Sequence, residues 1–391
     1  MSLTTDKTCA LVLGGHINGY SIIKELNYNG VSNIYLLDYG KSISQYSNKS
    51  KYIGVIESES MLREKIKDLR DKYKKIVVFP TDDHQLEMLA SIYSDIIDFC
   101  YIPCNSRALL FESDKSNQYR LCEKSDIPYP KSKVICNKFD IGSLESLEFP
   151  LIIKPITRVD RIQGDIFRNL YVNNLEELED KVGLIEFIVN LGVELLVSEF
   201  IPGDDTNIYA YTCFKGDDGV IYSEWVGKKL TQYPDDYGVV ASASNQAPEA
   251  VLELGRRLCE SMDSHGILEP EFKYDARDNS FKLMEVNLRS MMWNHVGYCS
   301  GVNLHSDLYD YANKIEIKPS KQNTKDVIHW VLMLHEIPNL LNRKGYWKHF
   351  KHNVFKGEKR HFAIFSFSDP LPFFASCIIL TKNLISQCLK R

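Results

Sequence analysis

The chain has 391 residues, enough for two or three domains of ordinary size. Hydrophobic residues make up 44% and charged residues 25%, which is typical of a globular protein, and the net charge of −5 argues against a nucleic-acid-binding protein, which would carry a strong basic excess. No stretch reaches the roughly 18 apolar residues that span a bilayer, so no transmembrane segment is expected, and the N-terminus lacks the basic and apolar runs of a signal peptide. Ten scattered cysteines without a CxxC pair favour reduced thiols in the cytoplasm.

Short apolar strands alternate with helices near the N-terminus. Strands are expected at Cys9–Leu13, Asn33–Asp38 and Lys75–Pro80, and an amphipathic helix at 60–73. This order predicts a doubly wound parallel sheet, in which ligands bind at the carboxyl ends of the strands. The polar residues expected at these ends, and therefore candidate substrate contacts, are His16, Asn18, Asp82 and Asp83.

A dinucleotide-binding domain is an alternative for this region. Such a domain would begin with a similar glycine-rich turn and would carry an acid such as Asp38 about 20 residues later. The turn at 14–19 reads GGHING instead of GxGxxG, which disfavours that alternative.

From about residue 113 the pattern changes to α+β. A helix is expected to run to about Ser125, with Ser113 or Asp114 as its N-cap. A second helix is expected at 248–264, with Pro248 in its first turn. The remaining expected elements are strands at 149–155, 170–172, 194–200, 207–214, 220–226, 268–274 and 281–286, and a helix at 174–190.

The hairpin formed by the last two strands carries the strongest chemical signal. Alternation with period 2 places Glu285, Asn287 and Arg289 on one face, and the tight connection brings Glu271 close to Glu285. Mg²⁺ prefers hard oxygen ligands, usually one or two carboxylates with phosphate oxygens and water. Arg289 would stabilise charge that develops in phosphoryl or acyl transfer. The alternative is a surface hairpin with solvated acids.

Cationic and hinge residues upstream of this hairpin supply what a nucleotide needs. Lys115 and Lys154 can neutralise phosphates, and Lys228–Lys229 adds a further cation. The segment 198–201 offers backbone groups and an acid, Glu199, for an adenine edge. Each lysine alone would most often be a solvated surface residue, but their order ahead of the hairpin favours a nucleotide site.

This order of residues resembles the ATP-grasp superfamily, and it is most similar to the carboxylate–amine ligases of the D-aspartate ligase kind. The likeness covers about residues 8–312. The motifs that carry it are Lys115, Lys154–Pro155, Glu199–Gly203, Lys228–Leu230, Glu271–Phe272 and Glu285–Arg289, together with GGHINGYSIIKEL, SKYI at Ser50–Ile53 and PTDD at Pro80–Asp83.

The resemblance implies an α/β N-terminal domain followed by an ATP-grasp fold with two α+β subdomains. The expected parts are a doubly wound pre-ATP-grasp domain at 1–112, a central and lid subdomain at 113–198, a C-terminal subdomain with the metal site at 199–318, and a basic, aromatic extension at 319–391.

The resemblance also implies roles for individual residues. Those expected to bind ATP are Lys115 and Lys154 at the phosphates, Glu199, Phe200 and Ile201 at the adenine, Asp204 or Asp205 at the ribose, and Lys229 at the γ-phosphate. Those expected to bind one or two Mg²⁺ ions, for which Mn²⁺ could substitute, are Glu271, Glu285 and Asn287. Arg289, at the acyl-phosphate, and Lys229 would be the catalytic side chains.

One segment departs from the family pattern. The loop that covers the phosphates is usually rich in Gly and Ser, whereas residues 157–168 contain one glycine and three arginines. Arg158, Arg161 and Arg168 would then replace backbone amides by guanidinium contacts to phosphate.

The reaction implied is amide-bond formation between a small carboxylate and an amine, through an acyl-phosphate, with ADP and phosphate as products. Further candidate substrate contacts, just past the metal strand, are Trp293, Asn294 and His295. An ATP-grasp carboxylase or purine-pathway enzyme, and a non-catalytic ATP-binding module, are the alternatives. Similar enzymes are often homodimers.

The C-terminal residues differ in charge from the rest of the chain. From residue 337 onward there are ten Lys or Arg against two acids, with apolar and aromatic runs between them. We expect an extension that packs on the core with its basic residues solvated. The alternative is a surface for an anionic membrane or a lipid-linked substrate, which would favour a cell-envelope or polysaccharide precursor.

Overall fold

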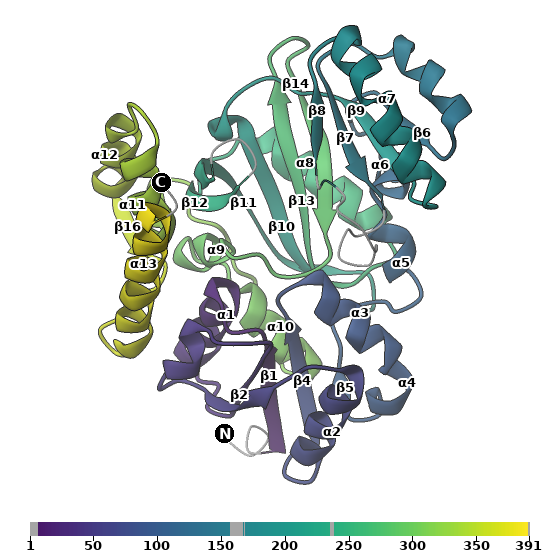
Figure 1. The fold of residues 1–391 in the computed structure, drawn as a ribbon. Coiled ribbons are helices and arrows are strands. Elements are labelled where there is room, and N and C mark those ends of the chain that lie inside the picture. Colours follow the sequence, from purple (N-terminus) through teal and green to yellow (C-terminus); the bar gives the residue numbers. More distant parts are fainter. Residues whose placement is uncertain (1–6, 157–166, 168, 235–237, 390–391) are drawn as a thin grey trace.

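A computed structural model describes residues 7–156, 167, 169–234 and 238–389, and the strands of these residues form three sheets (Figure 1). A five-stranded sheet lies near the N-terminus, a four-stranded sheet follows, and a seven-stranded sheet is built from the later strands. The expected succession of a parallel α/β unit and antiparallel α+β sheets is confirmed.

The N-terminal sheet is parallel, with the strand order β3-β2-β1-β4-β5. Its strands are β1 (Thr8–Leu13), β2 (Ile34–Asp38), β3 (Lys51–Val55), β4 (Lys75–Pro80) and β5 (Cys100–Tyr101), and its helices are α1 (Ile17–Tyr28), α2 (Glu59–Arg70), α3 (Asp83–Ser91) and α4 (Tyr93–Ile96). The strand order reverses between β1 and β4, where doubly wound sheets bind their ligands. Gly14 turns the chain there with φ of +84°, and the Thr81 hydroxyl donates to the Leu13 carbonyl at 2.7 Å. The loops after β1 and β4 therefore meet.

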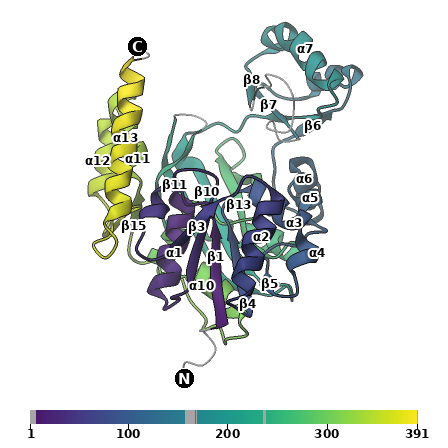
Figure 2. The same cartoon turned by 60° about the horizontal axis from the view of Figure 1, so that its bottom comes forward.

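The four-stranded sheet is antiparallel, with the order β6-β9-β7-β8, and it stands apart from the body of the molecule (Figure 2). Its elements are β6 (Ser132–Ile135), β7 (Leu151–Pro155), β8 (Leu170–Val172), α7 (Leu175–Asn190) and β9 (Leu195–Glu199). Helices α5 (Leu109–Glu112) and α6 (Lys115–Lys124) precede it. Asp114, the second of the two expected N-cap residues, caps α6 by accepting from the backbone of Ser116 and Asn117.

The seven-stranded sheet has the order β14-β13-β10-β11-β12-β15-β16. Its strands are β10 (Ile208–Lys215), β11 (Ile221–Tyr233), β12 (Val239–Ser244), β13 (Gly266–Asp275), β14 (Ser280–Asn287), β15 (Ile328–Val331) and β16 (Lys359–Phe362). Helix α8 (Glu249–Ser261) begins one residue later than expected, so Pro248 is its N-cap residue. Because β15 and β16 continue the sheet, the C-terminal region is built into the fold.

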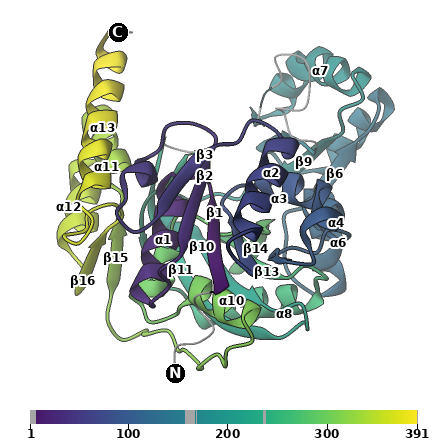
Figure 3. The same cartoon turned by 90° about the horizontal axis from the view of Figure 1, so that it is seen from below.

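A buried contact between Glu25 and His305 fastens the chain after β14 to helix α1 of the N-terminal domain. Helices α9 (His295–Cys299) and α10 (Leu304–Ala312) follow β14, and α10 lies against α1 (Figure 3). Between α10 and α1, Glu25 Oε2 lies 2.5 Å from His305 Nδ1, and both side chains are 1% exposed. The other ring nitrogen of His305 lies 2.7 Å from Ser290 Oγ.

Three C-terminal helices, α11 (Met333–Asn342), α12 (Trp347–Phe355) and α13 (Leu371–Leu389), form one flank of the molecule (Figure 1). Asp369, just before α13, ties this flank to the N-terminal domain because it accepts from Ser47 Oγ at 2.6 Å and from Tyr20 at 3.2 Å. Among the described residues, no helix combines the length and the apolar character needed to cross a bilayer.

We predict that His305→Ala lowers the free energy of unfolding by about 2 kcal/mol, because it removes the imidazole that contacts the buried Glu25 carboxylate and leaves that carboxylate only the backbone N–H donors of residues 305 and 306. Lys65→Ala, which removes an exposed i,i+3 pair with Asp68, should cost less than about 1 kcal/mol. Urea unfolding followed by circular dichroism measures both. Equal losses in the two variants would show that the buried pair does not fasten the two segments together.

Candidate active site

The β13–β14 hairpin brings the expected acidic residues together. Its antiparallel register pairs Glu271 with Glu285 and Glu269 with Asn287. Residues directly opposite each other in such a pair present their side chains on the same face, so these four polar side chains share one face. Arg289 lies just beyond the end of β14.

Two lysines from other segments pair with the hairpin glutamates. Lys115, in the first turn of α6, places Nζ 2.5 Å from Glu285 Oε2, and Lys229, on β11, places Nζ 2.8 Å from Glu271 Oε2. Glu271 and Lys229 are buried, with 4% and 8% of their surface exposed. The structure thus brings three segments together at one charged centre.

The charges of this centre shift the pKa values of its members. Lys115 holds the pKa of the Glu285 carboxyl well below its usual range, with help from Lys154 and Lys229. Burial would lower the pKa values of Lys115 and Lys229, but their glutamate partners raise both overall. Burial and the nearby Lys115 charge lower the pKa of Lys154 to about 8. The three lysines therefore form one cationic cluster around the carboxylates.

The donor set of the hairpin suits a hard divalent cation. Glu271, Glu285 and Asn287 supply two carboxylates and one amide oxygen, which are Mg²⁺ ligands by type. The Asn287 Nδ2 atom is buried without a hydrogen-bond partner, so this side chain is not committed to a protein contact through its nitrogen. In the part of the chain that the structure describes, there is no group of three or more His, Cys, Asp or Glu residues placed to hold a metal ion, so a cation here would take its remaining ligands from phosphate and water.

The expected adenine hinge follows β9, where the four-stranded sheet passes into the seven-stranded one. Glu199 is buried and accepts from the Glu148 backbone N–H at 3.0 Å. The Phe200 N–H donates to the Pro150 carbonyl at 2.8 Å, and the Lys273 ammonium lies 4.8 Å from the centre of the Phe200 ring. Ile201 is buried next to them.

The two candidate ribose ligands differ in their surroundings. Asp205 is buried, accepts from the Gln232 backbone N–H at 3.1 Å and lies 3.7 Å from Arg343 Nη1. Asp204 is exposed, and its carboxylate accepts from Thr206 beside it. Asp204 is therefore the more accessible of the two.

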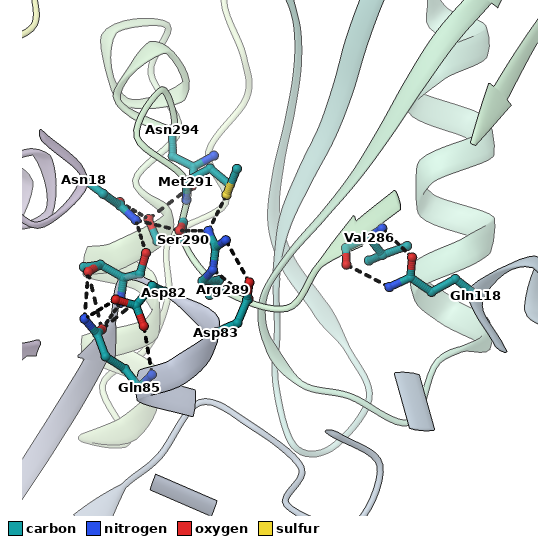
Figure 4. A network of polar contacts seen from close by, with 11 residues as sticks. Asn18, Asp82, Asp83, Gln85, Gln118, Val286, Arg289, Ser290, Met291 and Asn294 are labelled. Atoms are coloured by element: carbon teal, nitrogen blue, oxygen red, sulfur yellow. Dashed lines mark hydrogen bonds and ion pairs between the residues drawn. The ribbon is translucent and has the colours of Figure 1, made fainter. Parts of the chain in front are cut away.

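Of the four N-terminal candidates, Asp83 contacts Arg289, and Asn18 contacts the neighbouring Ser290 (Figure 4). Arg289 donates to Asp83 from Nε at 2.7 Å and from Nη2 at 3.1 Å, a two-pronged ion pair. Asn18 donates to the carbonyls of Thr81 and Ser290. Asp82 caps α3, and His16 is exposed at the start of α1.

The candidate substrate contacts after Arg289 are buried in the core; they are Trp293, Asn294 and His295. Trp293 and Asn294 contact Glu269, which was not among the predicted site residues. Glu269 is fully buried and accepts from Trp293 Nε1 at 2.9 Å, from Asn294 Nδ2 at 2.5 Å and from Thr212 Oγ1 at 2.8 Å. The sequence could have indicated Glu269 as a site residue, because it precedes Glu271 by two residues and so lies on the same face of the strand.

The loop that is expected to cover the phosphates contains three arginines. Arg158, Arg161 and Arg168 lie outside the described residues.

Comparison with known proteins finds a relative of similar sequence. No protein family model matches the sequence. The chain is 25% identical over 324 residues to D-aspartate ligase from Enterococcus faecium (strain Aus0004), which covers 78% of this chain and 76% of that protein.

Solved structures share the fold at low sequence identity. N5-carboxyaminoimidazole synthetase from Staphylococcus aureus, complexed with ADP, superposes with a TM-score of 0.63 at 14% identity and covers 88% of each chain. Biotin carboxylase from Campylobacter jejuni, in a β-γ-ATP complex, superposes with a TM-score of 0.62 at 13% identity and covers 81% of this chain and 73% of its own. The chain therefore shares the ATP-grasp fold of these solved structures, and it is similar in sequence to a carboxylate–amine ligase, D-aspartate ligase.

Proposed function

We propose that this chain is an ATP-dependent ligase that joins a carboxylate to an amine through an acyl-phosphate, releasing ADP and phosphate. The observation that carries the proposal is the pair of ion pairs at the β13–β14 hairpin. Lys115 neutralises Glu285 there, and Lys229 neutralises Glu271. A carboxylate is a poor electrophile until it is phosphorylated, and this step needs positioning and charge neutralisation rather than a protein nucleophile.

The roles of the ATP-binding residues follow from their positions. The hinge at Glu199–Ile201 holds the adenine, and the exposed Asp204 is better placed than Asp205 for the ribose. Lys115, Lys154 and Lys229 take the phosphates, because they surround the hairpin carboxylates. The reaction then takes place in the cytoplasm, where ATP is available.

Glu271, Glu285 and Asn287 would hold one or two Mg²⁺ ions, which supply charge neutralisation at the phosphates when bound. In the described structure, the charges of Lys115 and Lys229 neutralise those of Glu285 and Glu271. We infer an exchange of partners, in which Lys115 and Lys229 leave the carboxylates and donate to phosphate oxygens. The pairs therefore keep the centre neutral until the substrate arrives.

The Arg289–Asp83 ion pair marks the substrate side of the centre. A small amino acid carries the same two charges, so its carboxylate can bind Arg289 while its ammonium group binds Asp83. Asp83 remains accessible, with 49% of its side chain exposed. The curated relative is named for such a substrate, D-aspartate. We infer that an amino acid is one of the two substrates.

Incubation of the chain with Mg-ATP and pools of amino acids and amines tests the reaction class. We expect ADP and phosphate to be released only when a carboxylate and an amine are both present, and mass spectrometry should detect the amide. Release that depends on bicarbonate would show a carboxylase instead. Nucleotide binding without release from any pool would show a non-catalytic module.

Glu285→Gln should lower turnover by about 100-fold or more, since a lost metal ligand removes several kcal/mol of transition-state stabilisation. Asn287→Ala should act in the same direction. The matched control is Asp278→Asn in the turn of the same hairpin, where the side chain is 50% exposed and pairs with Lys282. Thermal unfolding should show all three variants folded. Turnover of Glu285→Gln equal to that of Asp278→Asn would contradict the site.

Lys154 predicts a pH dependence of nucleotide binding. The pKa of its ammonium is lowered to about 8, so the free protein loses this proton as the pH rises through that value. Phosphate stabilises the charged form, so binding above pH 8 takes up a proton, and affinity for Mg-ATP should fall by up to about tenfold per pH unit there. Calorimetry from pH 7 to pH 9.5 measures this fall.

Lys154→Met should bind Mg-ATP more weakly below about pH 8 and lose the slope above it. Lys133→Met, which removes an exposed lysine of β6, should keep both the affinity and the slope. A slope that survives in Lys154→Met would mean that another group is responsible.

A further inference from the structure

Helix α13 presents apolar residues to solvent. The sequence of Leu371–Leu389 contains one charged residue, Lys382. Leu371, Phe374, Ile378 and Ile385 are between 55% and 59% exposed, and their spacing of three, four and seven residues places them on one side of the helix. We call these four residues the α13 stripe. The end of α13 extends past the body of the molecule (Figure 2).

The surroundings of α13 add to this apolar surface. Phe367, in the turn before the helix, is 92% exposed. The opposite side of the helix lines an apolar groove of about 390 Å³, together with residues of α11 and β16 such as Ile337 and Phe362. A water-facing helix would normally show a polar outer face, and exposed apolar patches of this kind mark an interaction surface.

Basic residues lie on another helix of the same flank, α12 (Figure 1). Trp347 and Phe355 are exposed on α12, and the lysines exposed on or beside this helix are Lys344, Lys348, Lys351 and Lys356. Of the 47 Lys and Arg and the 52 Asp and Glu in the chain, residues 337–391 hold ten and two, so the first 336 residues hold 37 and 50. A basic, apolar flank is thus joined to an acidic body.

This charge distribution favours an anionic lipid surface over a second copy of the chain as the partner of the flank. A second copy bound through the α13 stripe would bring together two flanks that each have a basic excess, and like charges repel. An anionic lipid surface instead attracts the lysines and takes up apolar side chains at the same time. The acidic body would be repelled by that surface and would face away from it.

We propose that α12 and α13 dock the protein on an anionic membrane surface, with α13 lying in the plane of the interface, the α13 stripe among the acyl chains and the α12 lysines at the headgroups. Since no helix in the described ranges is able to cross a bilayer, the attachment is peripheral. The proposal does not depend on the ligase activity.

Co-sedimentation of the full chain with vesicles tests this docking. The probes are phosphatidylcholine vesicles with and without phosphatidylglycerol. We expect binding to the anionic vesicles that weakens with added salt, and little binding to the neutral ones. Phe374→Glu/Ile378→Glu should weaken partition into anionic vesicles by about tenfold or more. Lys348→Glu/Lys351→Glu should weaken it similarly by removing attraction to the headgroups.

The matched control is Phe139→Glu, which replaces an apolar side chain that is 84% exposed outside the flank and should leave partition unchanged. Thermal unfolding of each variant shows that it is folded, and the lysine variant provides a test that leaves α13 intact. The proposal is overturned if the unaltered chain ignores anionic vesicles, or if both double variants bind as it does. A dimer that Phe374→Glu/Ile378→Glu converts to a monomer, without vesicle binding, would assign the α13 stripe to a second copy instead.

Discussion

The site depends on the charges of Glu271 and Glu285, which lie directly opposite each other on the adjacent strands β13 and β14. Carboxylates held opposite one another repel, and burial of Glu271 removes much of the water that would screen it from Glu285. Lys229 and Lys115 offset these charges from β11 and from the first turn of α6. The two ion pairs therefore join separate segments around one centre. The same chemistry allows an exchange, because phosphate can replace the carboxylates at the lysines and a cation can replace the lysines at the carboxylates.

The segments behind the hairpin keep this centre in place. Glu269 fixes the chain after β14 by accepting from Trp293 and Asn294, and the Glu25–His305 pair fastens that chain to helix α1 of the N-terminal domain. Beside this centre, Asp83 at the start of α3 pairs with Arg289, two residues after the end of β14. The fold thus holds the charged centre and its neighbours in place by contacts between residues that are remote in sequence.

Local patterns predicted much of this arrangement. The tight connection between two strands was enough to bring Glu271 near Glu285, and short apolar strands that alternate with helices were enough to predict the N-terminal sheet. Pairings across long stretches of chain were not predictable, because periodicity carries no information about distant partners. Arg289 bonds Asp83 across 206 residues, and the C-terminal strands β15 and β16 extend a sheet that begins near residue 208. Glu269 was missed, although its spacing from Glu271 was visible.

A crystal structure of the chain with Mg²⁺ and a non-hydrolysable ATP analogue tests the exchange of partners most directly. The account predicts the adenine at the hinge, Mg²⁺ about 2.1 Å from oxygens of Glu271 and Glu285, and the ammonium groups of Lys115 and Lys229 on phosphate oxygens. Nucleotide bound away from the hairpin, or both lysine–glutamate pairs intact with the analogue in place, would contradict it.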